Sequence, residues 1–81
     1  MAKKSTSFSG SPALVSLGAA IRAARKAKGL SQEALAELAD IDRSYMGGVE
    51  RGEHNLATMN LLKIANALGT KASTLLITSG N

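Results

Sequence analysis

The stretch LSQEALAELADIDRSYMGGVER, residues 30–51, decides how this chain folds. Ser31 is a typical helix N-cap, and the apolar residues that follow it recur at the spacing of one helix face. Those apolar residues are Ala34, Leu35, Leu38 and Ala39. Asp40 and Ile41 interrupt the pattern, and Asp42 is in position to cap a second helix. The stretch therefore predicts two short helices around a tight turn.

The second predicted helix has an apolar face and a polar face. Met46 and Val49 lie at helical spacing and are expected to point inward. The opposite face is slim and polar and consists of Arg43, Ser44, Gly47, Gly48 and Arg51. In a DNA-binding helix-turn-helix, the second helix enters the major groove and presents its N-terminal residues to the base edges. The polar face is compatible with that role.

The longer run GLSQEALAELADIDRSYMGGVERG resembles the phage-repressor type of helix-turn-helix, the Cro/cI or XRE-like family of transcriptional regulators. The likeness extends over residues 17–76, and it is carried by Leu30-Ser31-Gln32, Ala36, Met46, Val49 and Glu50-Arg51-Gly52. The segment DRSYMGGVERGEHN also resembles the controller proteins of restriction-modification systems, a subset of that family. The resemblance implies an all-α, compact five-helix bundle of the lambda-repressor-like type, which binds specific double-stranded DNA and regulates transcription.

The resemblance also implies an ion pair inside the bundle. The family pairs an arginine, which is Arg25 here, with the glutamate of Glu-Arg-Gly, which is Glu50 here. Glu50 follows the inward Val49, and on the groove face it would repel phosphates, so we expect the pair to be largely buried. The family usually has glycine at the turn, where this chain has Asp40, a residue that tolerates a left-handed backbone less well.

A first helix is expected to begin at Ser11 and Pro12, because a hydroxyl cap followed by proline suits a first helical turn. Lys26 and Lys28 would end it with cations at its negative end, and Gly29 would stand beyond it. The inward residues of this helix would be Leu14, Leu17, Ile21 and Ala24.

Two more helices are expected after the central pair. One would run over about residues 58–68 and stop at Gly69, and a short one would run over about residues 72–77. Lys71 stands where the family usually has a small polar cap, so the first turn of the last helix is expected to be loose. The apolar residues of these two helices are Leu61, Ile64, Ala65, Leu68, Leu75 and Leu76.

The expected division of the chain is a flexible tail over residues 1–11, a DNA-binding domain over 12–77 and a short tail over 78–81. Lys3 and Lys4 form either a basic arm that reaches phosphates or part of a solvated tail. There is no cysteine, no apolar leader and no apolar run long enough to span a bilayer. We therefore expect a cytoplasmic protein with no cofactor, no membrane contact and no domain for a small-molecule effector.

The net charge of +4 is unevenly distributed. Residues 1–28 contain six basic side chains and no acid, whereas all six acids lie within residues 33–53. The helix-turn-helix is thus locally acidic, although phosphate neutralisation supplies most non-specific affinity for DNA. Glu33 and Glu37 are expected to form a solvated face rather than to approach DNA.

Nine residues are expected to bind DNA: Gln32, Arg43, Ser44, Tyr45, Gly47, Gly48, Arg51, His54 and Asn55. Arg43 is expected to read a base, because guanidinium binds guanine bidentately, and Ser44 to make a shorter-range contact. Gln32 would either bind a phosphate or brace Arg43.

Two interpretations of the paired glycines remain open. Bare backbone at Gly47 and Gly48 would let the helix sit deep in the groove and bring Tyr45 and Arg51 against the sugar-phosphate walls. Alternatively, the glycines mark a position that tolerates change.

Two residues of the following loop also have more than one possible role. His54 would be solvated or touch a phosphate, and Asn55 would bind the DNA backbone or cap the turn.

A homodimer is expected through the C-terminal segment. Leu75, Leu76 and Ile77 are three adjacent apolar residues, and one helical turn cannot direct all of them into a single small core. A chain of 81 residues has a small core of marginal stability, so a partner subunit would stabilise it. Two-fold symmetry would match a palindromic site.

A protein of a different class remains a rival interpretation. An antitoxin or a bridging cofactor would use the same helix-turn-helix to bind another protein, and the local acidity and the two glycines favour this rival slightly. Catalysis is not indicated: hydroxyl side chains are scattered over caps and loops, without a paired base. His54 with Glu50 and Glu53 lacks the spacing of metal ligands.

Overall fold

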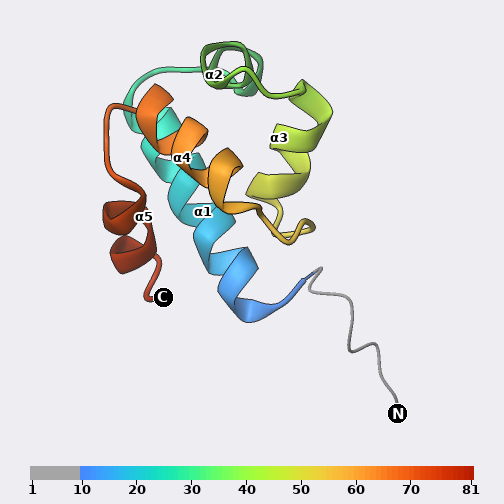
Figure 1. The fold of residues 1–81 in the computed structure, drawn as a ribbon, viewed down its shortest axis with the longest axis vertical. Coiled ribbons are helices and arrows are strands. Elements are labelled where there is room, and N and C mark those ends of the chain that lie inside the picture. Colours follow the sequence, from blue (N-terminus) through green and yellow to red (C-terminus); the bar gives the residue numbers. More distant parts are fainter. Residues whose placement is uncertain (1–9) are drawn as a thin grey trace.

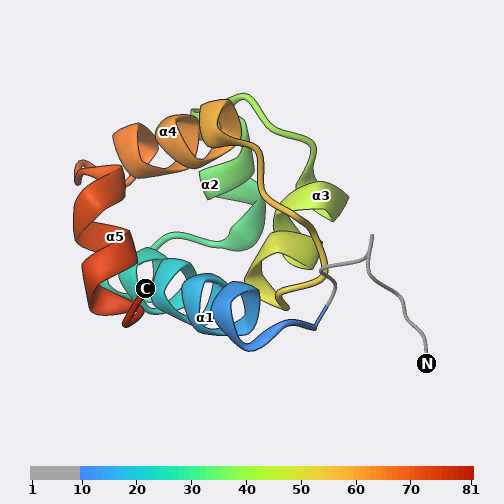
Figure 2. The ribbon, with the colours of Figure 1, turned by 60° about the horizontal axis from the view of Figure 1, so that its bottom comes forward.

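The computed structural model describes residues 10–81, which form five α-helices and no strand (Figure 1). These are α1 (Pro12–Ala27), α2 (Gln32–Ala39), α3 (Arg43–Glu50), α4 (Thr58–Ala67) and α5 (Ala72–Thr78). α1 packs against α3 and α5, α2 packs against α3 and α4, and α4 packs against α5. In Figure 2, α1 and α4 lie on opposite sides of the bundle, with α5 at one end and α3 at the other. The all-α five-helix bundle expected from the sequence is confirmed.

The first two helices begin at the serine caps that the sequence predicted. Ser11 Oγ accepts a hydrogen bond from the amide of Leu14 at 3.3 Å, and Ser31 Oγ accepts one from Ala34 at 3.0 Å. These bonds satisfy amides that have no partner within the helix. The positions of the two caps fix where α1 and α2 start.

The turn between α2 and α3 adopts the backbone conformation that the family usually assigns to glycine. Asp40 has φ 58° and ψ 51°, which is left-handed helical backbone. The turn closes through hydrogen bonds from the amide of Asp40 to Glu37 O at 3.1 Å and from Ile41 to Ala36 O at 2.9 Å. Asp40 therefore adopts this conformation at a steric cost of roughly 1 kcal/mol, which glycine would not carry.

The core lies where all five helices meet, and its buried residues are Leu17, Ile21, Leu35, Ala36, Ala39, Met46, Val49, Ile64, Ala65, Leu68 and Leu75. The expectation that Leu38 points inward is wrong, because its side chain is 62% exposed. The inward face of α2 is formed by Leu35, Ala36 and Ala39, and Leu38 is turned by about 100° from Ala39 around the helix axis. Ala36 is 2% exposed and belongs to the core.

The C-terminal residues 78–81, which were expected to form a short tail, begin with the last residue of α5. α5 extends to Thr78, and Gly80, with φ 83°, reverses the chain. The side-chain amide of Asn81 then donates to the carbonyl oxygen of Ala13 at 2.9 Å. Lys71 provides no side-chain hydrogen bond to the start of α5, as expected. Asn81 therefore contacts α1, because the glycine permits the turn and the asparagine reaches a carbonyl of that helix.

The N-terminal tail expected over residues 1–11, with Lys3 and Lys4, falls outside the described residues except at its end. Gly10 is described, and its amide donates to the carbonyl oxygen of Gly52 at 2.8 Å. No helix within residues 10–81 is long and apolar enough to cross a bilayer.

Candidate nucleic-acid interface

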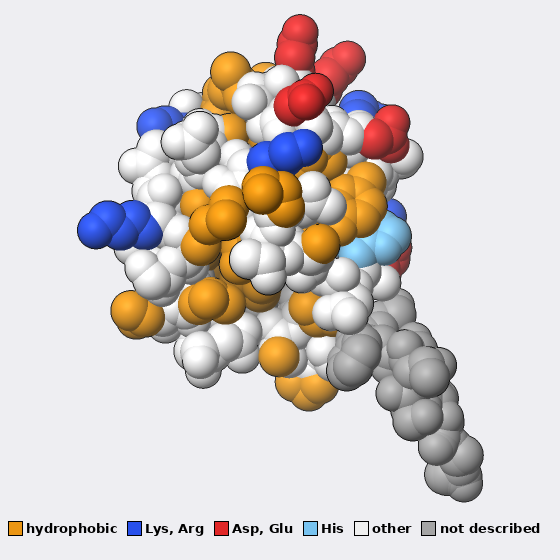
Figure 3. Space-filling view, in the orientation of Figure 1, with side chains coloured by type: hydrophobic (Ala, Val, Ile, Leu, Met, Phe, Trp, Pro, Cys, Tyr) orange, Lys and Arg blue, Asp and Glu red, His pale blue; other side chains and the backbone are white. Residues whose placement is uncertain are grey.

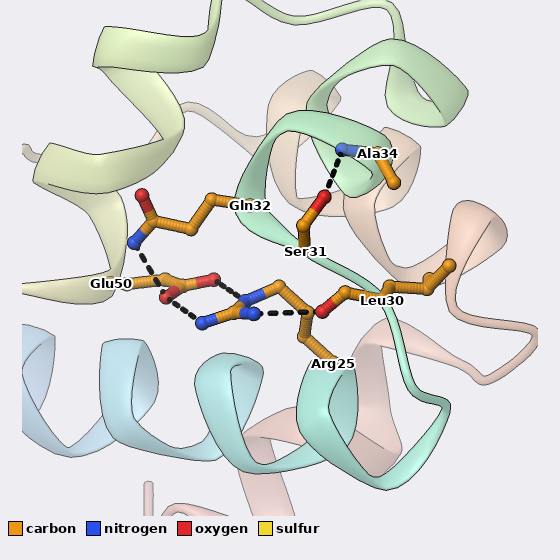
Figure 4. Close-up of polar contacts among 6 residues, drawn as sticks. All are labelled: Arg25, Leu30, Ser31, Gln32, Ala34 and Glu50. Carbon is orange, nitrogen blue, oxygen red and sulfur yellow. Dashed lines mark hydrogen bonds and ion pairs between the residues drawn. The ribbon is translucent and has the colours of Figure 1, made fainter.

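A buried ion pair joins the end of α3 to α1 (Figure 4). Arg25 donates from Nε to Glu50 Oε2 at 2.7 Å and from Nη2 to Oε1 at 3.2 Å. The two side chains are 9% and 2% exposed. Arg25 Nη1 also donates to the carbonyl oxygen of Leu30 at 2.8 Å. The pair has the partners that the sequence predicted, and it fixes α3 relative to α1 and to the start of α2.

Gln32 completes this network. Its Nε2 donates to Glu50 Oε1 at 3.0 Å, and Figure 4 shows the amide reaching the carboxylate from α2. No hydrogen bond joins Gln32 to Arg43 within the described residues, so the brace on Arg43, one of the two roles expected for Gln32, is not formed. A carboxylate only accepts hydrogen bonds, so the amide nitrogen faces Glu50 and the amide oxygen faces away. Binding of that amide to a phosphate stays a prediction.

The start of α3 carries two exposed polar side chains beside a cap. Asp42 Oδ2 accepts from the amides of Ser44 at 3.0 Å and Tyr45 at 3.3 Å, and also from the Ser44 hydroxyl. That hydroxyl bond, with the Tyr45 amide next in importance, holds the pKa of Asp42 below its usual range. Arg43 and Ser44 are both exposed, and Arg43 forms no ion pair within residues 10–81. The capped start of α3 thus leaves Arg43 and Ser44 exposed to solvent.

The paired glycines of α3 are buried, and the expectation that they leave bare backbone is wrong. A Cβ built on Gly48 would stand 2.6 Å from Cδ2 of the His54 ring and closer still to its Nε2. A Cβ on Gly47 would stand 3.1 Å from Nη1 of Arg51. The chain returns over α3 after the helix ends, so side chains of the next segment cover the glycines.

An aromatic stack connects α3 to the loop that follows it. The rings of Tyr45 and His54 have centroids 4.6 Å apart and planes 17° apart. The Tyr45 hydroxyl accepts from Asn60 Nδ2 of α4 at 3.2 Å. His54 is therefore half-buried rather than freely solvated, while Asn55 beside it is exposed.

A second ion pair lies on the surface just beyond α3. Arg51 Nε donates to Glu53 Oε2 at 2.9 Å, and Arg51 Nη2 donates to Oε1 at 3.1 Å. The side chains are 60% and 48% exposed. The hydrogen bond from Arg51 lowers the pKa of Glu53, and the same bond raises the pKa of Arg51. Arg51 was expected to contact the sugar-phosphate backbone of DNA, and here its guanidinium binds Glu53.

The three residues expected at a dimer interface have different environments. Leu75 is 3% exposed and belongs to the core, so its assignment to a dimer surface is wrong. Leu76 is half-buried and packs against the core, whereas Ile77 is 77% exposed. α5 packs against α1 and α4, and Leu75 is the residue of this helix that is buried.

Acidic side chains gather at the top of the molecule in Figure 3, where Figure 1 places α2. Glu33 and Glu37 of α2 are both exposed, as expected of a solvated face. Within residues 10–81, no group of three or more histidine, cysteine, aspartate or glutamate side chains is arranged to hold a metal ion.

Three contacts of this region were not foreseen from the sequence. A Cβ on Gly18 of α1 would stand 2.6 Å from the carbonyl oxygen of Glu50, so the backbones of α1 and α3 touch there. A glycine within the apolar stripe of the first helix was the available indication. The pairing of Glu53 with Arg51 was foreshadowed only by opposite charges two residues apart, and nothing indicated the role of Asn60.

The fold and this arrangement define a class of protein. A family model described as helix-turn-helix matches residues 21–75, which is more than half of the chain. The chain belongs to this helix-turn-helix family, and the family expected from the sequence is confirmed.

Individual proteins of known sequence or structure resemble this chain. The control protein C.SmaI of Serratia marcescens is 42% identical over 60 residues, which are 74% of this chain and 71% of that protein. The crystal structure of the restriction-modification controller protein C.AhdI from Aeromonas hydrophila is 53% identical, with a TM-score of 0.75 over 76% of this chain and 94% of that one. SinR, a master regulator for biofilm formation solved in complex with DNA, is 36% identical, with a TM-score of 0.71 over 74% of this chain and 97% of that one.

Proposed function

We propose that this protein regulates transcription by binding specific sites on double-stranded DNA as a homodimer, with α3 in the major groove. The observation that carries the proposal is the exposed start of α3, where Arg43 and Ser44 project beside the Asp42 cap. The buried pair of Arg25 and Glu50 holds that helix in place. The family membership and the DNA complex of SinR support the same function.

The proposed contacts divide into base readout and backbone binding. Arg43 reads a guanine through its bidentate guanidinium, and Ser44 makes a shorter contact next to it. Asn55 binds a phosphate through its exposed amide group, and Gln32 binds one through the amide N–H that it does not donate to Glu50. Tyr45 and His54 contact the groove wall as one stacked unit.

The proposed dimer interface lies at the end of α5. Ile77 is 77% exposed, and Leu76 next to it is only half-buried, so the two offer an apolar contact to a second copy. Two-fold symmetry would place two copies of α3 on half-sites about 10 bp apart or a multiple of that. Light scattering of Ile77→Asp is expected to show a monomer where the wild type is a dimer. An unchanged dimer would place the interface elsewhere.

Capture of genomic fragments by the purified protein, followed by sequencing, tests the function directly. We expect enrichment of a palindromic sequence. Titration of a random duplex with salt provides the second measurement, and its affinity is expected to fall steeply as salt rises. If neither an enriched sequence nor salt-dependent binding is found, the proposed function is wrong.

A protein-binding module is the alternative function. The exposure of Leu38 at 62% and of Met59 at 63%, on α2 and α4, favours it, as do the acids of α2. A module of this kind would bind random duplex weakly at any salt concentration, so the same titration separates the two functions. We assign the chain no catalytic role, and we propose that it acts in the cytoplasm, where a bacterial regulator meets DNA.

A further inference from the structure

The surface pair of Arg51 and Glu53 lies on the side of α3 that is proposed to face DNA. Glu53 is fixed there by its backbone, because its amide donates to the carbonyl oxygen of Gly48 at 2.9 Å. Gly52 between the pair has φ 76° and turns the chain. Arg51 lies back over α3, with Nη1 3.1 Å from the point where a Cβ of Gly47 would stand. The guanidinium is therefore held over the middle of the helix.

The contact with Glu53 occupies the group that a phosphate would use. Nε and Nη2 of Arg51 form one bidentate edge, and both nitrogens donate to Glu53, at 2.9 and 3.1 Å. A carboxylate and a phosphate bind this edge in the same planar, two-bond geometry. Glu53 therefore competes with a phosphate for Arg51, and its own charge repels the DNA backbone once Arg51 has left it.

We propose that Glu53 is a positioning residue that holds Arg51 away from phosphate in the free protein. Glu53 thereby lowers the affinity of the protein for every DNA duplex. This inference rests on the proposed DNA-binding function. DNA binding then includes an exchange in which Arg51 leaves the carboxylate of Glu53 and binds a phosphate oxygen. The exchange gives one of the acids of this locally acidic region a defined role.

Substitution Glu53→Gln tests the inference, because it keeps the size of the side chain and removes its charge. Binding to a fluorescently labelled random duplex is measured over a series of salt concentrations. We expect affinity to rise about two- to five-fold, the range typical of an exposed ion pair. The plot of log affinity against log salt is expected to steepen by up to about 0.9, because the variant has no carboxylate that takes up a cation from solution when Arg51 moves to the phosphate.

A double-mutant cycle shows whether Glu53 acts through Arg51. In the Arg51→Ala background, Glu53→Gln is expected to leave the salt slope unchanged and to raise affinity by clearly less than in the wild type. An equal rise in both backgrounds would mean general charge repulsion and would overturn the inference. Weaker binding by Glu53→Gln alone would mean that Glu53 orients Arg51 for DNA, and would overturn it too.

Glu37→Gln is the matched control, because Glu37 is an exposed glutamate of α2 that forms no ion pair within residues 10–81. It makes the same change in net charge and is expected to leave the salt slope unchanged. A slope as steep as that of Glu53→Gln would overturn the inference. If the wild type itself binds no duplex even at low salt, the proposed function fails. If the wild type binds and Glu53→Gln changes nothing, only this inference fails.

Discussion

The inner side of α3 touches the backbone of α1, whereas its outer side is covered by the ends of flexible side chains. On the inner side, Gly18 leaves room for the carbonyl groups of Val49 and Glu50, and a buried ion pair lies about two turns further along α1. On the outer side, the ring of His54 and the guanidinium of Arg51 lie over two glycines. A backbone moves away from an added methyl group only if the whole helix shifts, whereas the end of a side chain can rotate away by itself. The inner side therefore sets where α3 points, and the outer side can change without loss of the fold.

The largest effect is expected from breaking the buried pair on the inner side. Arg25→Met would leave the carboxylate of Glu50 buried without its partner, at a cost of roughly 3 to 5 kcal/mol. Glu50→Gln would strand the guanidinium in the same way. Thermal melts measure both. If each single variant melts within a degree or two of wild type, the pair does not anchor α3.

Gly18→Ala is expected to destabilise the fold by about 1 to 3 kcal/mol, because the methyl group would stand 2.6 Å from the carbonyl oxygen of Glu50 and α1 would have to move. Gly47→Ala is the matched control on the outer side. Its methyl group meets only the end of the exposed Arg51 side chain, which can shift, so the gain in helix propensity, up to about 1 kcal/mol, is expected to dominate. Urea denaturation of both variants gives the comparison. Equal stabilities would show that the two sides of α3 do not differ.

Gly48→Ala is expected to move His54 off Tyr45 while the fold is kept. The gain in helix propensity of about 1 kcal/mol is similar in size to the loss of a stacked pair, about 0.5 to 1.5 kcal/mol. The chain has one tyrosine and no tryptophan, so its ultraviolet fluorescence reports on Tyr45 alone. The emission is expected to change in Gly48→Ala and in His54→Ala, but not in Gly47→Ala. If Gly48→Ala has the same emission as wild type, the ring of His54 does not lie between Gly48 and Tyr45 as the structure indicates.

The smallest effect is expected from acid at the start of α3. Hydrogen bonds from Ser44 and Tyr45 hold the pKa of Asp42 below its usual 3.8 in the folded chain, so the folded state takes up a proton less readily than the unfolded state. The cap therefore contributes its full stability to the fold at pH values above the usual pKa of Asp42. That contribution is lost as the pH falls through the lower pKa that Asp42 has in the folded chain. Melting temperatures of wild type and Asp42→Asn, compared from pH 7 to pH 3, are expected to converge in acid. Parallel curves would show that Asp42 does not contribute in this way.

Local patterns were sufficient to predict the helices. The caps at Ser11, Ser31 and Asp42 bind backbone amides only two or three residues further along the chain. Both partners therefore lie within one short stretch of sequence. The pair of Arg25 and Glu50, 25 residues apart, came from the family resemblance and not from periodicity. Local chemistry alone does not specify a contact at that separation.

The outward surface was harder to predict because it depends on where the chain returns. The sequence predicted exposed backbone at the glycines of α3. The path of residues 51–54 is needed to see that this segment brings Arg51 and His54 over them. The prediction that Leu38 is buried was wrong for a related reason. Apolar spacing defines a stripe, but the neighbours of α2 decide which edge of the stripe is buried, and Leu38 lies on the open edge.

The hydrogen bond between Asn81 and Ala13 has a consequence for protein engineering. Because Asn81 lies against the first turn of α1, a short peptide linker could join residue 81 to the start of that helix without crossing the core. New termini could then be opened in the exposed part of the loop between α3 and α4. Such a circular permutant would keep every helix and would free the segment that covers the glycines from its peptide connection to α4.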